Sequence, residues 1–275
     1  MTRSVRRTRR MMQVAGVGAA ALLALTACSS SDDDSAGTSD PSGSASASGK
    51  LSGEVTVFAA ASLKESFESL GKTFEKAHPG TKVTFSFGGS DALAASITGG
   101  APADVFASAS PKTMKIVTDA GDNAGEPATF VRNQLEIATL PGNPDKVASL
   151  KDLTDSDLKV VLCDKTVPCG AAAEKALTAS KVKLTPVSYE EDVKSALNKV
   201  VLKEADAALV YKTDVQAAGD KVEGVEFPES ADAVNDYPIT LLKGSKNTAT
   251  AEAFIALVRS AEGQKVLTGA GFLQP

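Results

Sequence analysis

Gly88, Gly89 and Ser90 separate an apolar strand pattern over residues 82–87 from a helical pattern that runs through Leu93 and Ile97. In one interpretation the glycines form a turn and Ser90 caps the helix. In the other, the loop brings backbone N–H groups and a hydroxyl up to an anion. One junction alone does not decide between a cap and a binding site.

Three further junctions have the same character. Ser62 follows a strand pattern over residues 54–60 and opens a helix, with Glu65 at the spacing of a capping box. Pro168, Cys169 and Gly170 follow a buried-type strand over 158–162 and precede an alanine-rich helix. The fourth is the helical segment 189–201, which leads into a strand that ends at Tyr211. Each feature taken singly has a structural explanation: Ser62 is a helix cap, residues 168–170 are a tightly packed helix start, and Tyr211 is an aromatic residue at the edge of the sheet.

The elements that position these residues alternate between strand and helix, which predicts a parallel-type α/β sheet. Ligands of open α/β sheets lie beyond the carboxyl ends of the strands, next to helix N-termini. All four junctions and Tyr211 belong to that edge. Their agreement favours an anion-binding site over four unrelated caps.

The N-terminus carries targeting signals. Five arginines precede a short apolar run that ends in Leu25-Thr26-Ala27-Cys28, as in a bacterial lipoprotein signal peptide. We expect residues 1–27 to be the signal peptide and Cys28 to carry a lipid. Residues 28–52 are rich in Ser, Asp and Gly and are expected to form a flexible tether. The protein would then be extracytoplasmic and anchored to the cell membrane.

Charge and cysteine content exclude some ligands. Removing the leader leaves 24 basic and 34 acidic residues, a net charge of −10, which argues against nucleic acid. An anion site in such a chain must be built from local dipoles.

Cys163 and Cys169 would lie in an oxidising compartment, and we expect them to form a disulfide. The single histidine, His78, offers no zinc pattern.

Six segments resemble, in order, the molybdate-binding proteins of ABC transporters. They are VFAAASL, FGGSDALAASITGGAPADVFASAS, VPCGAAAEKAL, EEDVKSAL, ADAALVYKTD and DYPITLL. The resemblance implies a type II periplasmic-binding-protein-like fold, with two domains of mixed sheet and flanking helices around a ligand cleft. It places domain I at residues 53–132 plus 236–275, and domain II at 133–235. The return strand would start at Tyr237-Pro238.

The resemblance also implies five ligand positions for a molybdate oxyanion: Ser62, Ser90, Cys169, Val193 and Tyr211. Cys169 and Val193 would contribute backbone N–H groups. We expect capture of molybdate, and of tungstate, for an ABC permease with a separate cytoplasmic ATPase. The protein would be a monomer that is not an enzyme and needs no cofactor. Two departures bear on the pocket: Cys169 replaces a common alanine, and Ala171 and Ala172 replace a common aromatic.

Other functions account for parts of the same pattern. The same fold could bind sulfate or phosphate, and Asp91 would suit a protonated oxyanion if it pointed inward; we expect it to face out. Ferric iron would need clustered tyrosines and carboxylates, whereas the chain has three tyrosines. A hydrolase with Ser62 or Ser90 as nucleophile lacks a suitably placed histidine and a GxSxG motif. A purely structural lipoprotein would leave the four junctions as caps.

Overall fold

The computed structural model describes residues 50–275, which belong to one compact unit. The predicted signal peptide, Cys28 and most of the predicted tether lie outside the described residues. Among residues 50–275, no helix is long and apolar enough to cross a bilayer.

The first sheet has the strand order β2-β1-β3-β10-β4. Its strands are β1 (Gly53–Ala60), β2 (Thr81–Gly88), β3 (Val105–Ala107), β4 (Ala128–Asn133) and β10 (Asn235–Leu241). β1 is parallel to β2 and β3, whereas β10 is antiparallel to β3 and β4. Its helices are α1 (Lys64–Ala77), α2 (Ser90–Thr98), α3 (Pro111–Asp119), α7 (Thr248–Arg259) and α8 (Ala261–Gly269). Phe67, Leu70 and Phe74 of α1 are buried in the apolar core that this sheet forms with its helices.

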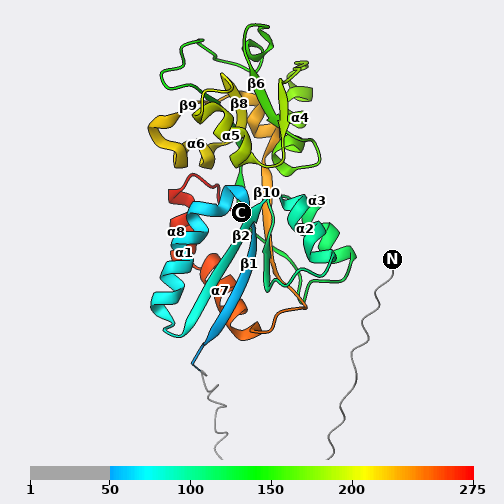
Figure 1. Cartoon of the computed structure of the whole chain (residues 1–275), viewed down its shortest axis with the longest axis vertical. Coiled ribbons are helices and arrows are strands. Elements are labelled where there is room, and N and C mark those ends of the chain that lie inside the picture. The colour runs from blue at the N-terminus through cyan, green and yellow to red at the C-terminus, as the bar shows by residue number, and fades with distance from the viewer. Residues whose placement is uncertain (1–49) are drawn as a thin grey trace, which may run out of the picture. The chain divides into compact units, whose positions relative to one another are not determined.

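The second sheet has the order β7-β6-β8-β5-β9. Its strands are β5 (Leu135–Thr139), β6 (Val160–Cys163), β7 (Ser188–Glu190), β8 (Ala207–Tyr211) and β9 (Glu223–Val225). The helices are α4 (Pro168–Ala179), α5 (Val193–Val201) and α6 (Lys212–Ala218). β6 is parallel to β7 and β8, and β5 is antiparallel to β8 and β9. Two mixed sheets flanked by helices are the predicted architecture, and Figure 1 shows them as two lobes.

The chain crosses between the lobes at two adjacent positions. β4 ends at Asn133 and β5 begins at Leu135, while the return strand β10 begins at Asn235. Asn235 is the register partner of Asn133. The return strand therefore starts two residues before the predicted Tyr237, and its register with β4 shifts between Tyr237 and Pro238. A proline cannot donate to the ladder, which accounts for an irregularity at this point.

The carboxyl ends of β1, β2, β6 and β8 all lead to the junction between the lobes (Figure 1). Three helices, α2, α4 and α5, begin there at Ser90, Pro168 and Val193. The fold therefore gathers the four predicted strand–helix junctions at one place.

Candidate functional site

The five predicted ligand positions line one small cavity between the lobes. Ser62 and Ser90 come from the first lobe, and Cys169, Val193 and Tyr211 from the second. The cavity volume is about 10 Å³, measured as the space open to the centre of a water molecule. Each of the five residues is at most 4% exposed. The structure thus brings all five together, while their contact with a ligand stays a prediction.

Ser62 does not cap a helix. It lies in a short 3₁₀ turn, Ala61–Leu63, and α1 begins at Lys64 without a side-chain cap. The predicted capping box with Glu65 is therefore wrong. The Ser62 hydroxyl instead lies 2.9 Å from the Tyr237 hydroxyl, at the cavity wall. A serine followed three residues later by glutamate is found at helix caps, but a serine of a binding site can have the same neighbour. Only the three-dimensional structure distinguishes the two cases.

Ser90 is the first residue of α2, as predicted, but its side chain does not cap that helix. Its Oγ accepts a hydrogen bond of 3.0 Å from the Ala109 N–H. The Ser90 hydroxyl hydrogen therefore remains able to donate into the cavity. The preceding residue is Gly89. A Cβ at this position would lie 2.6 Å from the Glu191 carbonyl oxygen of the other lobe. Only glycine permits this close approach between the lobes.

Asp91 differs in part from the expectation that it faces out. The residue does not line the cavity, but its Oδ1 is buried and has no hydrogen-bond partner among the described residues. A Cβ on Gly89 would lie 2.8 Å from this atom. One oxygen of the Asp91 carboxylate is therefore packed against Gly89 and is not exposed to solvent.

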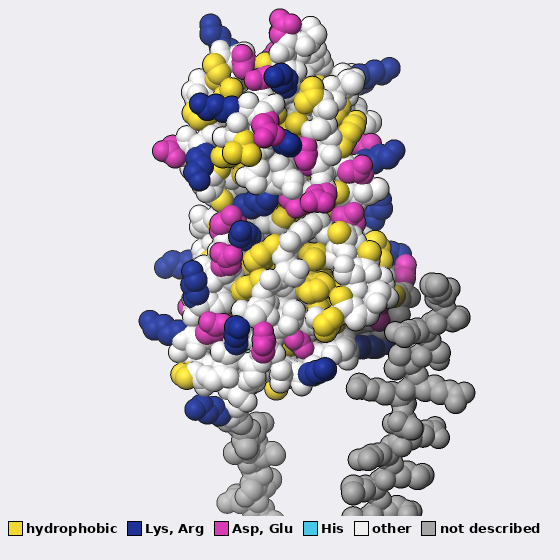
Figure 2. All heavy atoms as spheres, in the orientation of Figure 1, with side chains coloured by type: hydrophobic (Ala, Val, Ile, Leu, Met, Phe, Trp, Pro, Cys, Tyr) yellow, Lys and Arg dark blue, Asp and Glu magenta, His cyan; other side chains and the backbone are white. Residues whose placement is uncertain are grey.

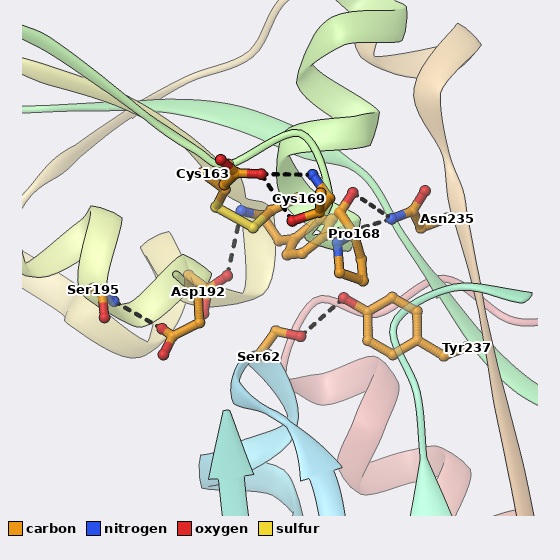
Figure 3. Close-up of a disulfide and its surroundings, with 12 residues drawn as sticks. Ser62, Cys163, Pro168, Cys169, Asp192, Ser195, Asn235 and Tyr237 are labelled. Atoms are coloured by element: carbon orange, nitrogen blue, oxygen red, sulfur yellow. Dashed lines mark hydrogen bonds between the residues drawn. A yellow bond between two sulfur atoms is a disulfide. The ribbon is translucent and has the colours of Figure 1, made fainter. Parts of the chain in front are cut away.

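α4 begins with Pro168, and its first helical backbone donor is the N–H of Ala171, which bonds to the Val167 carbonyl. Proline has no N–H, so the helix leaves the amides of Cys169 and Gly170 without helical partners. Cys169 is disulfide-bonded to Cys163, the last residue of β6, which confirms the predicted pairing (Figure 3). The bond ties the end of the strand to the start of the helix at the cavity.

We expect replacement of both Cys163 and Cys169 by alanine to lower the free energy of unfolding by about 2 kcal/mol, because the bond closes a short loop. Ligand affinity should change less than about threefold, since Cys169 is predicted to contribute its backbone N–H. Urea unfolding and calorimetric titration measure the two effects. A large loss of affinity at unchanged stability would show that the sulfur chemistry itself matters for binding.

α5 begins at Val193 and is capped by Asp192, whose carboxylate accepts 2.9 Å from the Ser195 N–H (Figure 3). Asp192 also lines the cavity and was not predicted. Val193 is the first residue of α5 and lines the cavity, so its amide has no helical partner. An aspartate directly before an apolar-periodic helix is the N-cap signal that could have identified it.

Tyr211 ends β8 and is buried. Its hydroxyl accepts a hydrogen bond of 2.7 Å from Asn235 Nδ2. Burial, together with nearby Tyr237, raises the pKa of Tyr211 well above its ordinary value of 10. The phenol therefore stays protonated at neutral pH and can act as a donor.

Asn133, Asn235 and Tyr237 complete a polar network that sequence reasoning missed. Tyr237 is buried, and its hydroxyl lies between Ser62 Oγ and Asn133 Nδ2, at 2.9 and 3.4 Å. Burial raises the pKa of Tyr237, so it too stays protonated. In the sequence these residues mark only the points where the chain is expected to change domain.

An ionic group joins the lobes beside the cavity. Lys194 of α5 lies 2.9 Å from both carboxylate oxygens of Glu65 in α1 and 3.1 Å from Oδ1 of buried Asp214 in α6. Burial raises the pKa of Asp214 to about 6, although Lys194 acts in the opposite direction. Burial lowers the pKa of Lys194, but Asp214 and Glu65 outweigh it and the net pKa is raised. The ion pair between Glu65 and Lys194 thus links α1 of one lobe to α5 of the other.

Asp214 gives a testable pH dependence. Its pKa is higher in the folded protein, about 6, than the ordinary 3.8, so protonation favours the folded state as the pH falls through 6. Between pH 7 and 5 the wild type should gain about 1 kcal/mol of unfolding free energy relative to Asp214→Asn. Urea unfolding of both proteins at the two pH values measures this. A difference that is independent of pH would contradict the raised pKa.

The chemistry of the cavity is that of hydrogen-bond donation. Three hydroxyls and the first amides of two helices converge on it, and the N-termini of α2, α4 and α5 add favourable potential for an anion. On the face drawn in Figure 2, basic and acidic side chains are interspersed rather than gathered in a basic patch. The attraction for an anion is therefore local to the cavity.

Comparisons with known proteins identify the family of the chain. Residues 55–273 match the bacterial extracellular solute-binding protein family. The molybdate-binding protein ModA of Mycobacterium tuberculosis is 42% identical over 239 residues, covering 87% of this chain and 92% of the relative.

Solved structures share the fold. The periplasmic molybdate-binding protein of Azotobacter vinelandii has a TM-score of 0.69 at 22% identity, covering 80% of this chain and 99% of that one. The sulfate-binding protein SubI of Mycobacterium tuberculosis has a TM-score of 0.68 at 19% identity, covering 80% and 86%. Because proteins named for molybdate and for sulfate share this fold, the fold alone does not identify the anion. The family of the chain is instead shown by its sequence identity to curated relatives. The chain is a member of the bacterial extracellular solute-binding protein family and, within it, a relative of the molybdate-binding proteins ModA.

Proposed function

We propose that this protein is an extracytoplasmic binding protein that captures molybdate, and also tungstate, and delivers it to an ABC importer. One observation carries the proposal: five donor positions from two lobes converge on a single small cavity. The identity to ModA supports molybdate over another oxyanion.

Molybdate at neutral pH is a tetrahedral dianion with four acceptor oxygens and no donor. A specific site therefore needs donors only, and Ser62, Ser90 and Tyr211 supply hydroxyls while Cys169 and Val193 supply amides. Hydrogen bonds to a charged group contribute about 1.5–3 kcal/mol each. Five or more of them support nanomolar affinity, about 12 kcal/mol, after the cost of association.

Size should separate molybdate from sulfate. Donors placed around a larger tetrahedral anion cannot all reach the oxygens of a smaller one, so sulfate should bind more weakly. Tungstate is nearly equal in size to molybdate and should bind similarly. The alternative, a sulfate or phosphate carrier of the same fold, predicts the opposite order of affinities.

The remaining parts of the proposal concern the chain's context. Cys28, at the end of the signal-peptide pattern, is proposed to carry the lipid that anchors a monomer to the membrane. The permease and its ATPase would be separate subunits. The protein would act by binding and release, without catalysis and without a cofactor.

Domain bounds are proposed at residues 53–132 plus 236–275 for domain I and 133–235 for domain II. The membership of the sheets supports them, because β4 and β10 pair in one sheet and β5 to β9 belong to the other.

Replacement of Tyr211 by phenylalanine should weaken molybdate binding by about 1–3 kcal/mol, because one donor to the anion is lost. Folding stability should fall by only about 1 kcal/mol, since the ring still fills its buried site while Asn235 loses one hydrogen-bond partner. Calorimetric titration and thermal unfolding measure both. Tyr189→Phe is the matched control, because Tyr189 is 60% exposed. Unchanged affinity in Tyr211→Phe would remove this residue from the site.

A further inference from the structure

Two buried asparagines lie at the crossing between the lobes. Asn133 ends β4 and Asn235 begins β10, and the two are register partners. They are 0% and 6% exposed. A buried side-chain amide needs hydrogen-bond partners, and the partners of these two lead to the hydroxyls of the binding cavity.

Backbone groups fix the orientation of both amides. Asn235 Nδ2 lies 3.2 Å from the Pro168 carbonyl oxygen, which can only accept, so the amide nitrogen must face it (Figure 3). The same nitrogen then donates to the Tyr211 hydroxyl oxygen at 2.7 Å.

Asn133 is oriented in the same way. Its Oδ1 accepts 3.1 Å from the Gln134 N–H, which can only donate. Its Nδ2 therefore faces the Thr213 hydroxyl at 2.8 Å and the Tyr237 hydroxyl at 3.4 Å.

A hydroxyl that accepts from the protein keeps its own hydrogen for another acceptor. Tyr211 accepts from Asn235, so its own hydrogen is available to donate, either to the neighbouring Tyr237 hydroxyl or to a ligand in the cavity. Tyr237 accepts from Asn133 and can direct its hydrogen to Ser62 Oγ, which leaves the Ser62 hydrogen for the cavity. With Ser90, which accepts from the Ala109 N–H, all three cavity hydroxyls become donors.

We propose that Asn235 and Asn133 are positioning residues that fix Tyr211 and, through Tyr237, Ser62 as donors to the anion. A fully deprotonated tetrahedral oxyanion is the ligand that such donors fit, as the proposed function requires, and the two asparagines are the groups that keep the hydroxyls donating. An O–H of the ligand would find no acceptor among these three hydroxyls, which is costly in a buried site. This inference rests on the proposed oxyanion-binding function.

The test is a double-mutant cycle on the purified protein. Molybdate affinity is measured by calorimetry, and phosphate affinity by competition against molybdate, for wild type, Asn235→Leu, Tyr211→Phe and the double variant. Asn235→Leu should weaken molybdate binding about tenfold, the worth of one hydrogen bond. In the Tyr211→Phe background the same change should weaken binding less than about twofold, because Asn235 acts through the missing hydroxyl.

Selectivity is the second readout. In Asn235→Leu the Tyr211 hydroxyl is free to rotate and accept, so the ratio of molybdate to phosphate affinity should fall about tenfold. Asn198→Leu, at an exposed position in α5, is the control and should change neither quantity.

Asn235→Asp covers the case in which the leucine variant does not fold. It keeps the shape of Asn235 but presents an acceptor to Tyr211, which should turn that hydroxyl away from the cavity and weaken molybdate binding more than tenfold. Additive losses with an unchanged molybdate-to-phosphate ratio would show a merely structural role and overturn the inference, while leaving the proposed function intact. A wild type that does not bind molybdate would instead reject the proposed function, and the inference with it.

Discussion

Lys194→Met is expected to lower the free energy of unfolding by about 3 kcal/mol or more at pH 7. The substitution leaves buried Asp214 without its cation, and breaking a buried ion pair in this way costs about 3–5 kcal/mol. Because Lys194 lowers the pKa of Asp214, its removal should raise that pKa further above 6. The loss of stability should therefore be smaller at pH 5, where Asp214 is protonated, and urea unfolding at both pH values measures it.

The same variant should weaken ligand binding, although Lys194 does not line the cavity. Its bonds to Glu65 join α5 to α1, and without them the two lobes that form the cavity lose a contact.

Lys199→Met is the matched control for Lys194→Met. Lys199 lies in the same helix and pairs with Glu204, but both side chains are exposed, so the cost should be under about 1 kcal/mol. Equal losses in the two variants would contradict a buried, lobe-bridging role for Lys194.

Gly170→Ala should destabilise the protein by about 3 kcal/mol and weaken molybdate binding more than tenfold. A Cβ at this position would lie 2.0 Å from the Asp164 carbonyl oxygen and 2.6 Å from that of Cys163. Backbone atoms cannot move aside as a side chain can, so the start of α4 must shift. That shift displaces the amide of neighbouring Cys169 from the cavity, and both thermal unfolding and calorimetry should register it.

Two other glycines separate the effects on folding and binding. A Cβ on Gly263 in α8 would lie 2.2 Å from the Leu257 carbonyl oxygen, so Gly263→Ala should lower stability without changing intrinsic affinity. A Cβ on Gly244 would meet nothing within 4 Å, and Gly244→Ala should change neither. If Gly170→Ala bound molybdate as the wild type does, the start of α4 would not form the site.

The sequence was sufficient to predict the architecture and the place of the site. The strand patterns over residues 54–60 and 82–87 correspond to β1 and β2, and the helical pattern over 189–201 contains α5. The resemblance to molybdate-binding proteins named five positions that the fold brings to one cavity. These features follow from local sequence patterns and motifs, which can be identified in one amino-acid sequence without knowledge of the fold.

Long-range polar contacts were not predictable in the same way. The spacing of Ser62 and Glu65 indicated a cap, but Ser62 bonds to Tyr237, 175 residues away, and Glu65 to Lys194, 129 residues away. The asparagines at the crossing carry no local motif, because their partners are set by the pairing of β4 with β10. Such contacts follow from the assembled fold rather than from any one segment.

Calorimetric titration of the purified protein with molybdate, repeated with sulfate and with phosphate, tests the central claim most directly. We predict tight one-to-one binding of molybdate, with sulfate and phosphate far weaker. Silence with molybdate together with tight binding of sulfate or phosphate would contradict the named ligand while retaining the anion-binding fold.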